Sequence, residues 1–183
     1  MLATAFGVEH LTKLDVAERE LRAAICLLFD DGDPVAVHTL AASALGILED
    51  LAEHRGMETL WTLRDSPYIR EGKRKQWITA LHEAQNYFKH ADRDPDAPLE
   101  FNRELPHLFI VSALQLYTQL TQTLKPWPEA FVYLLWFSVK YPEVMAEDAS
   151  QADAPFWVGL GFDANNFGPL RALLAYCRTA GVG

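Results

Sequence analysis

Apolar residues recur along this chain at the three- and four-residue spacing of an α-helix, and no stretch alternates convincingly as a strand would. The spacing predicts six or seven helices, over residues 12–29, 33–55, 57–63, 72–91, 103–124, 130–141 and 168–178. We therefore expect an all-α fold, an antiparallel bundle of four or five helices. Residues 12–125 would form its core, and residues 126–183 a C-terminal helical arm that packs on the core within one domain.

Two helix starts are marked by their own residues. Thr12 precedes the first helix with Asp15 three positions later, which approximates a capping box. Asp33 and Pro34 are the N-cap and first-turn residues expected at the start of the second helix. The few residues between these helices predict an antiparallel pair, and the small residues at Ala41–Gly46 would let a neighbouring helix approach closely.

Composition and charge exclude several classes of protein. The 183 residues are 50% hydrophobic and 11% aromatic, which excludes a chain disordered throughout. The net charge of −9 argues against a protein that coats nucleic acid, although Arg64–Arg93 is locally basic. The longest unbroken apolar run, Phe131–Phe137, is far shorter than the ~18 residues of a membrane span. With two cysteines and no signal-peptide pattern at the start, we expect a cytoplasmic protein without membrane association.

The helix predicted over residues 72–91 carries the most chemistry. At about 100° per residue, Leu81, Ala84 and Phe88 lie on the same side as Trp77 and form a packing face. The opposite side carries a strip of polar residues, with Gln85 beside it. The candidate ligand or interface residues on this helix are His82, Glu83, Gln85, Asn86, Lys89 and His90.

Residues 85–90, with the sequence QNYFKH, resemble the signature of HEPN domains, small helical bundles found in prokaryotic defence and toxin systems. That signature is an Arg, often followed directly by a polar residue, and then a His a few positions later. Asn86 fits the polar position and His90 fits the histidine, whereas Gln85 stands where the Arg would be. The resemblance would cover residues 12–125.

This resemblance implies a homodimer, because HEPN ribonucleases place the motif at a two-fold interface and cleave RNA without a metal or other cofactor. In them the Arg supplies positive charge to the phosphate, and Gln85 carries none. We therefore expect a non-catalytic interaction or regulatory protein in a defence or toxin–antitoxin setting, with a protein or RNA partner. The alternative is a ribonuclease in which His90 is the acid/base while Asn86 and Lys89 contact the phosphate.

Other constellations predict less. His82 and His90 are about 12 Å apart along one helix, too far to share a metal ion without help from other helices, so we expect no metal site. His107, next to Pro106 in a first turn, is expected at the surface, and Cys26 is expected to be an inert packing residue. His38 is expected to be buried or at a boundary, where it could face His90. A ligand-binding bundle using His38 and Phe131–Phe137 is a third hypothesis without a motif.

Overall fold

The computed structural model describes residues 7–57, 71–92, 95–123, 126–142 and 163–181. Within these ranges every regular element is a helix, which confirms the all-α prediction. The predicted helix over residues 57–63 lies almost wholly outside them. The elements are α1 (Lys13–Phe29), α2 (Pro34–His54), a 3₁₀ turn η1 (Glu71–Lys73), α3 (Arg74–Lys89), α4 (Leu105–Thr121), α5 (Pro128–Lys140) and α8 (Phe167–Ala180).

Both predicted helix starts are confirmed. The Thr12 hydroxyl accepts a hydrogen bond from the backbone N–H of Asp15, while the Asp15 carboxylate accepts one from the backbone N–H of Thr12. At the start of α2, the Asp33 carboxylate accepts a hydrogen bond from the Val35 backbone N–H at 2.8 Å. Helix α2 ends before Gly56, whose φ of +62° is costly for any residue with a Cβ. Local sequence therefore sets these helix ends.

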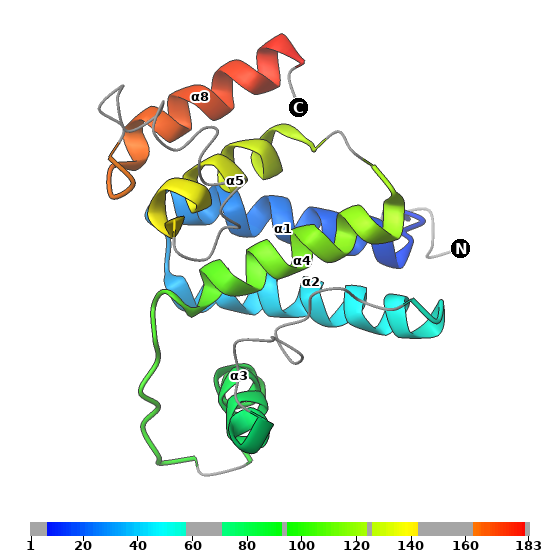
Figure 1. The fold of residues 1–183 in the computed structure, drawn as a ribbon, viewed down its shortest axis with the longest axis vertical. Coiled ribbons are helices and arrows are strands. Elements are labelled where there is room, and N and C mark those ends of the chain that lie inside the picture. Colours follow the sequence, from blue (N-terminus) through cyan, green and yellow to red (C-terminus); the bar gives the residue numbers. More distant parts are fainter. Residues whose placement is uncertain (1–6, 58–70, 93–94, 124–125, 143–162, 182–183) are drawn as a thin grey trace.

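Helices α1, α2 and α4 enclose the main core (Figure 1). Leu21 and Ile25 of α1, Leu48 of α2 and Ile110 of α4 are fully buried there. Helix α2 is the one helix in the described part of the chain that is long and apolar enough to span a bilayer. Its apolar residues instead pack between α1 and α4, the position expected for a central helix of a bundle.

Helices α2 and α4 run parallel, while the other consecutive bundle helices alternate in direction (Figure 1). His38 and Phe109, near the beginnings of α2 and α4, have ring centroids 4.6 Å apart. At the opposite ends, the Arg55 guanidinium donates a hydrogen bond to the Leu120 carbonyl. The segment that includes α3 makes this possible, because it carries the chain back to the end at which α2 begins.

Helices α5 and α8 pack on α1 and so attach the predicted C-terminal arm to the core. Trp136 of α5 lies edge-on to Phe29 of α1, and Phe167 of α8 contacts both rings. The Trp136 indole N–H also donates a hydrogen bond to the Ala164 carbonyl at 2.8 Å. Apolar contact and a satisfied polar group therefore act together at this junction.

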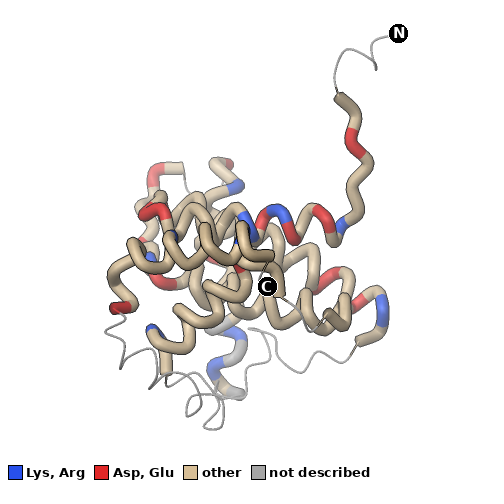
Figure 2. The backbone as a smooth tube through the Cα atoms, turned by 90° about the horizontal axis from the view of Figure 1, so that it is seen from above, with Lys and Arg blue, Asp and Glu red and all other residues tan. Residues whose placement is uncertain are grey.

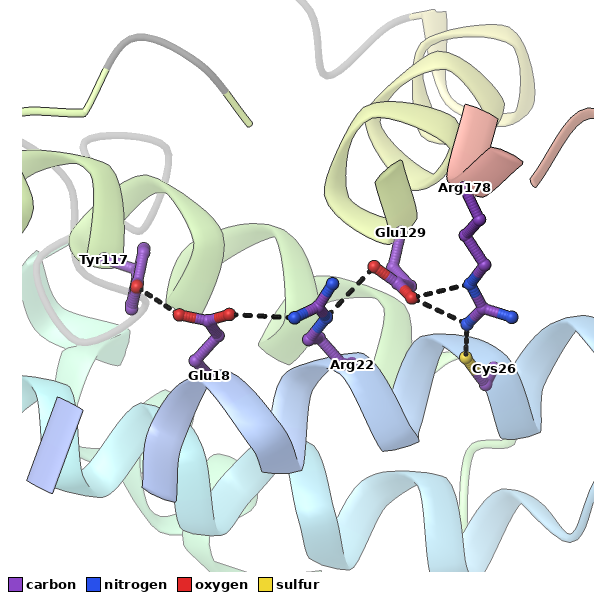
Figure 3. Close-up of polar contacts among 6 residues, drawn as sticks. All are labelled: Glu18, Arg22, Cys26, Tyr117, Glu129 and Arg178. Atoms are coloured by element: carbon purple, nitrogen blue, oxygen red, sulfur yellow. Dashed lines mark hydrogen bonds and ion pairs between the residues drawn. The ribbon is translucent and has the colours of Figure 1, made fainter. Parts of the chain in front are cut away.

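A polar network crosses the same junction (Figure 3). Its members are Glu18, Arg22, Cys26, Tyr117, Glu129 and Arg178. At its centre is Glu129 of α5, which is 3% exposed and pairs with Arg22 at 3.1 Å and Arg178 at 2.6 Å. Burial alone would raise the pKa of Glu129, but the hydrogen bonds from Arg178 and the charges of both arginines lower it below its ordinary value. The buried carboxylate is thus ionised and paired with residues of α1 and α8.

Helix α3 lies apart from the bundle and is seen nearly end-on in the view that shows α1, α2 and α4 lengthwise (Figure 1). Leu81 and Ala84 are buried and Phe88 is half-buried, so these three members of the predicted packing face do pack. The side chain of Trp77, its fourth member, lies outside the described part. Residues 95–104, which we call the strap, connect α3 to α4.

Candidate functional site

A groove of about 560 Å³ runs between α3 and the strap. Four of the six predicted site residues line its α3 wall, namely His82, Glu83, Asn86 and His90. The strap contributes an apolar wall from Ala97, Pro98 and Leu99, and Ile78 adds further apolar surface. A concave apolar surface with a few convergent polar groups is the usual form of a binding site.

The polar wall of the groove follows from helix geometry. Positions four apart lie on the same face of a helix, so His82, Asn86 and His90 form one row along α3. Tyr87 lies beside that row, and its hydroxyl donates a hydrogen bond to the Ala97 carbonyl at 2.8 Å. This bond ties the strap to α3 and keeps the two walls of the groove together.

The other two predicted residues lie elsewhere. Gln85 lines a separate cavity of about 180 Å³ between α3 and α2, whose floor includes Ala42 and Gly46. A Cβ on Gly46 would meet no atom within 4 Å, as expected where small residues leave space beneath a neighbouring helix. Lys89 is exposed and lines neither cavity. His82 lines this cavity as well as the groove, so Gln85 shares a cavity with one of the four groove residues, whereas Lys89 shares neither space with them.

The groove offers little positive charge. Among the described residues that line it, Glu83 is the one carboxylate, and none is a Lys or Arg. The ring of His90 is half-exposed, and its Nδ1 lies 3.9 Å from an Asp92 carboxylate oxygen. Elsewhere along the described backbone, Lys and Arg occur at several separate places, and so do Asp and Glu (Figure 2). Among the described lining residues, a phosphate would find no arginine or lysine.

Sequence reasoning missed the part of the site that the strap supplies. Tyr87, Ala97, Pro98 and Leu99 were not among the candidates, although they form one wall of the groove or hold it in place. The available signal was the pair of prolines at 95 and 98, which favours an extended segment after the helix. Nothing in the local pattern shows that this segment folds back along α3.

Two histidines outside the groove are buried. His38 is fully buried, as one reading of the sequence expected, but its ring faces Phe88, Phe101 and Phe109, not His90. The prediction that His107 lies at the surface is wrong, because Trp136 and Tyr141 cover it and leave it 8% exposed. Burial lowers the pKa of each of these histidines to about 4.

His107 has hydrogen-bond partners that His38 lacks. Its Nδ1 lies 2.6 Å from the Tyr141 hydroxyl, and its backbone carbonyl accepts a hydrogen bond from Tyr133 at 2.6 Å. These contacts join the beginning of α4 to α5. His107 is therefore a residue that holds two helices together, and it does not face the groove.

Cys26 and the acidic side chains give no further site. Cys26 is half-buried, and burial raises the pKa of its thiol despite a contact of 3.0 Å between its Sγ and the Arg178 guanidinium. A thiol with a raised pKa is a poor nucleophile at neutral pH. In the part of the chain that the structure describes, no three His, Cys, Asp or Glu side chains are close enough to hold a metal ion.

With this geometry established, the chain was compared with known proteins. No protein-family model matches it, and no curated protein or solved structure shows significant similarity to it.

Proposed function

We propose that this protein is a non-catalytic helical interaction protein of HEPN-like type, that it forms a homodimer, and that the α3 groove is its interaction surface. The observation that carries the proposal is that His82, Glu83, Asn86 and His90 line one groove with apolar walls. A polar helix face that only contacts solvent would not need apolar walls beside it. A protein partner supplies both the apolar surface and the hydrogen-bonding groups that such a groove can bury.

The chemistry of the groove favours a protein over RNA as partner. Asn86 can donate and accept hydrogen bonds, and a neutral imidazole donates from one ring nitrogen and accepts at the other. The apolar groups of Ile78 and Leu99 offer area to be buried. A phosphate backbone would instead approach Glu83 without a compensating Lys or Arg among the described lining residues.

The resemblance to HEPN domains supports the same proposal. Asn86 and His90, the two residues that fit the signature, lie on the wall of one groove, and Gln85, in the Arg position, lies on another side of α3. The described lining of the groove therefore has no Lys or Arg to supply the positive charge that a HEPN-like ribonuclease would use on the phosphate. A regulatory partner in a defence or toxin–antitoxin system remains the biological setting that we propose.

Light scattering on the full chain at micromolar concentration tests the proposal. We expect a dimer for the wild type and a shift toward monomer for Asn86→Ala/His90→Ala, because both substitutions remove polar groups from the groove wall. The matched control is Tyr176→Ala/Thr179→Ala, two exposed positions on α8, which lies on the opposite side of the bundle from α3 (Figure 1). A monomeric wild type, or a dimer that only the α8 variant weakens, would contradict the proposal.

A ribonuclease is the second candidate, because Asn86 and His90 share the groove wall. It predicts RNA cleavage that persists in EDTA and disappears in His90→Ala, with Lys89→Ala reduced as well. We expect no such cleavage, since Lys89 does not line the groove. Cleavage by the wild type that is lost in His90→Ala would replace the interaction proposal with the enzymatic one.

A further inference from the structure

His38 of α2 is a buried titratable side chain with no hydrogen-bond partner. Its exposed fraction is 0%, and neither ring nitrogen has a partner within the described part of the chain. Three phenyl rings enclose it, with centroids 4.6 Å away for Phe109, 5.5 Å for Phe101 and 5.8 Å for Phe88. Buried polar groups are nearly always hydrogen-bonded, so an unpartnered imidazole here calls for an explanation.

The position of His38 in the fold explains this unpartnered imidazole. Phe88 belongs to α3, Phe101 belongs to the strap, and their rings contact each other at 5.2 Å. Both walls of the groove therefore rest on the same histidine. Phe109 completes the enclosure from α4, a helix of the bundle core. His38 is the point at which α3 and the strap together meet the bundle.

We propose that His38 is a pH-sensitive latch: the neutral imidazole lets α3 and the strap dock on α2 and α4, and its protonation shifts the equilibrium toward their release. Because α3 and the strap are the two walls of the groove, release would dismantle the groove. This consequence for partner binding rests on the proposed function. The docking and its release do not.

The surroundings of the ring disfavour its charged form. Each element packed against it presents a phenyl ring, namely Phe88 from α3, Phe101 from the strap and Phe109 from α4. Burial is the sole cause of the lowered pKa, so no titratable or charged group in the described part of the chain offsets it. The docked state therefore favours the neutral imidazole.

The size of the effect follows from two pKa values. The docked pKa is about 4, and the pKa of a solvated histidine is about 6.5. Linkage between these values raises the undocked fraction about tenfold between pH 7.5 and pH 5.5. Below pH 4 the docked form also binds the proton, and the dependence levels off.

Hydrogen exchange followed by mass spectrometry tests the latch on the full chain. Exchange is measured at pH 7.5 and 5.5, corrected for intrinsic rates, in peptides from α3, the strap and α1. For the wild type we expect α3 and the strap to be less protected than α1 at both pH values, because they open without the whole fold, and we expect their protection to fall about tenfold at pH 5.5. His38→Leu and His38→Gln do not titrate and should abolish the fall. His54→Leu, an exposed histidine at the end of the same helix, should leave it intact.

Three results would overturn the latch. They are α3 protection that does not change with pH in the wild type, α3 protection equal to that of α1 at both pH values, which would mean that α3 opens only with the whole fold, and a fall that persists in both His38 variants. Light scattering measures the oligomeric state and so tests the proposed function separately. A monomeric wild type with pH-dependent α3 protection would remove the dimer and leave the latch standing, whereas a dimer without that dependence would do the reverse.

Discussion

Glu129 and His38 are both buried ionisable residues on two different sides of the molecule, and they differ in the partners that surround them. Glu129 at the α1, α5 and α8 junction is held by Arg22 and Arg178 (Figure 3). His38, where α3 meets the bundle, has no hydrogen-bond partner in the described part of the chain. A buried charge with partners resists displacement, while an unpartnered neutral base tolerates burial only as long as it stays neutral.

The cavities show the same difference. The groove of about 560 Å³ and the cavity of about 180 Å³ both border α3. Trp136, at the other junction, is 1% exposed and packs against Phe29 and Phe167. Elements that move in function come from the less stable parts of a fold. In the proposed latch, α3 and the strap are therefore the movable part, and the α5 and α8 side is the fixed part.

Truncating one phenyl ring on each side gives the largest expected contrast. Phe29→Ala should lower the free energy of unfolding by about 4 kcal/mol, because Phe29 is 1% exposed in the core. Phe88→Ala should lower it by less than about 2 kcal/mol, because its ring is half-buried, and should mainly reduce exchange protection in α3. Urea unfolding followed by circular dichroism measures both. Equal losses would abolish the contrast between the two sides.

Glu129→Gln tests whether the paired side depends on its charge. The substitution keeps the shape of the side chain but leaves Arg22 and Arg178 without their buried anion. We expect it to lower the free energy of unfolding by about 3 kcal/mol, at the low end for a broken buried pair because both arginines are partly exposed. Glu104→Gln is the control, since Glu104 is exposed and pairs with Lys140 at 3.5 Å. Glu104→Gln should lower the free energy of unfolding by less than about 1 kcal/mol. If Glu129→Gln costs no more than this control, the network contributes no more than a surface pair.

Acid should weaken the whole fold through His38 and His107. Their folded pKa values, about 4, are lower than the unfolded value of about 6.5, so the unfolded chain binds more protons between these limits. Stability is therefore fully present above pH 6.5 and falls as the pH drops toward 4. From pH 7.5 to 5 we expect a loss of about 2 kcal/mol for each histidine. Urea unfolding of wild type and His38→Leu at both pH values should show a smaller loss in the variant.

Removing one hydroxyl is the smallest of these changes. Tyr133→Phe deletes a buried hydrogen bond of 2.6 Å to the His107 carbonyl and should cost about 1 kcal/mol. Tyr176→Phe on α8, where the side chain is 63% exposed, should change stability by less than about 0.5 kcal/mol. Thermal unfolding separates the two. Equal effects would mean that the link between α4 and α5 contributes little to the fixed side.

The sequence predicted the helices better than the burial of their polar residues. Thr12 and Asp33 mark helix starts through hydrogen bonds to residues two or three positions away, and both starts are confirmed. His107 was predicted at the surface because it follows a proline in a first turn. It is buried because Tyr141, more than thirty residues later, lies against its ring. Glu129 passed unnoticed, because its two partners come from α1 and α8.

The candidate site, too, was predictable only in part from the sequence. The regular advance of about 100° per residue places His82, Asn86 and His90 on one face of α3, which the sequence by itself determines. Only the tertiary structure decides that the strap covers that face to make a groove, and that Gln85 and Lys89 lie outside it. Helical spacing depends on bonds within a few residues. Burial, cavities and shifted pKa values depend on segments that meet only when the chain has folded.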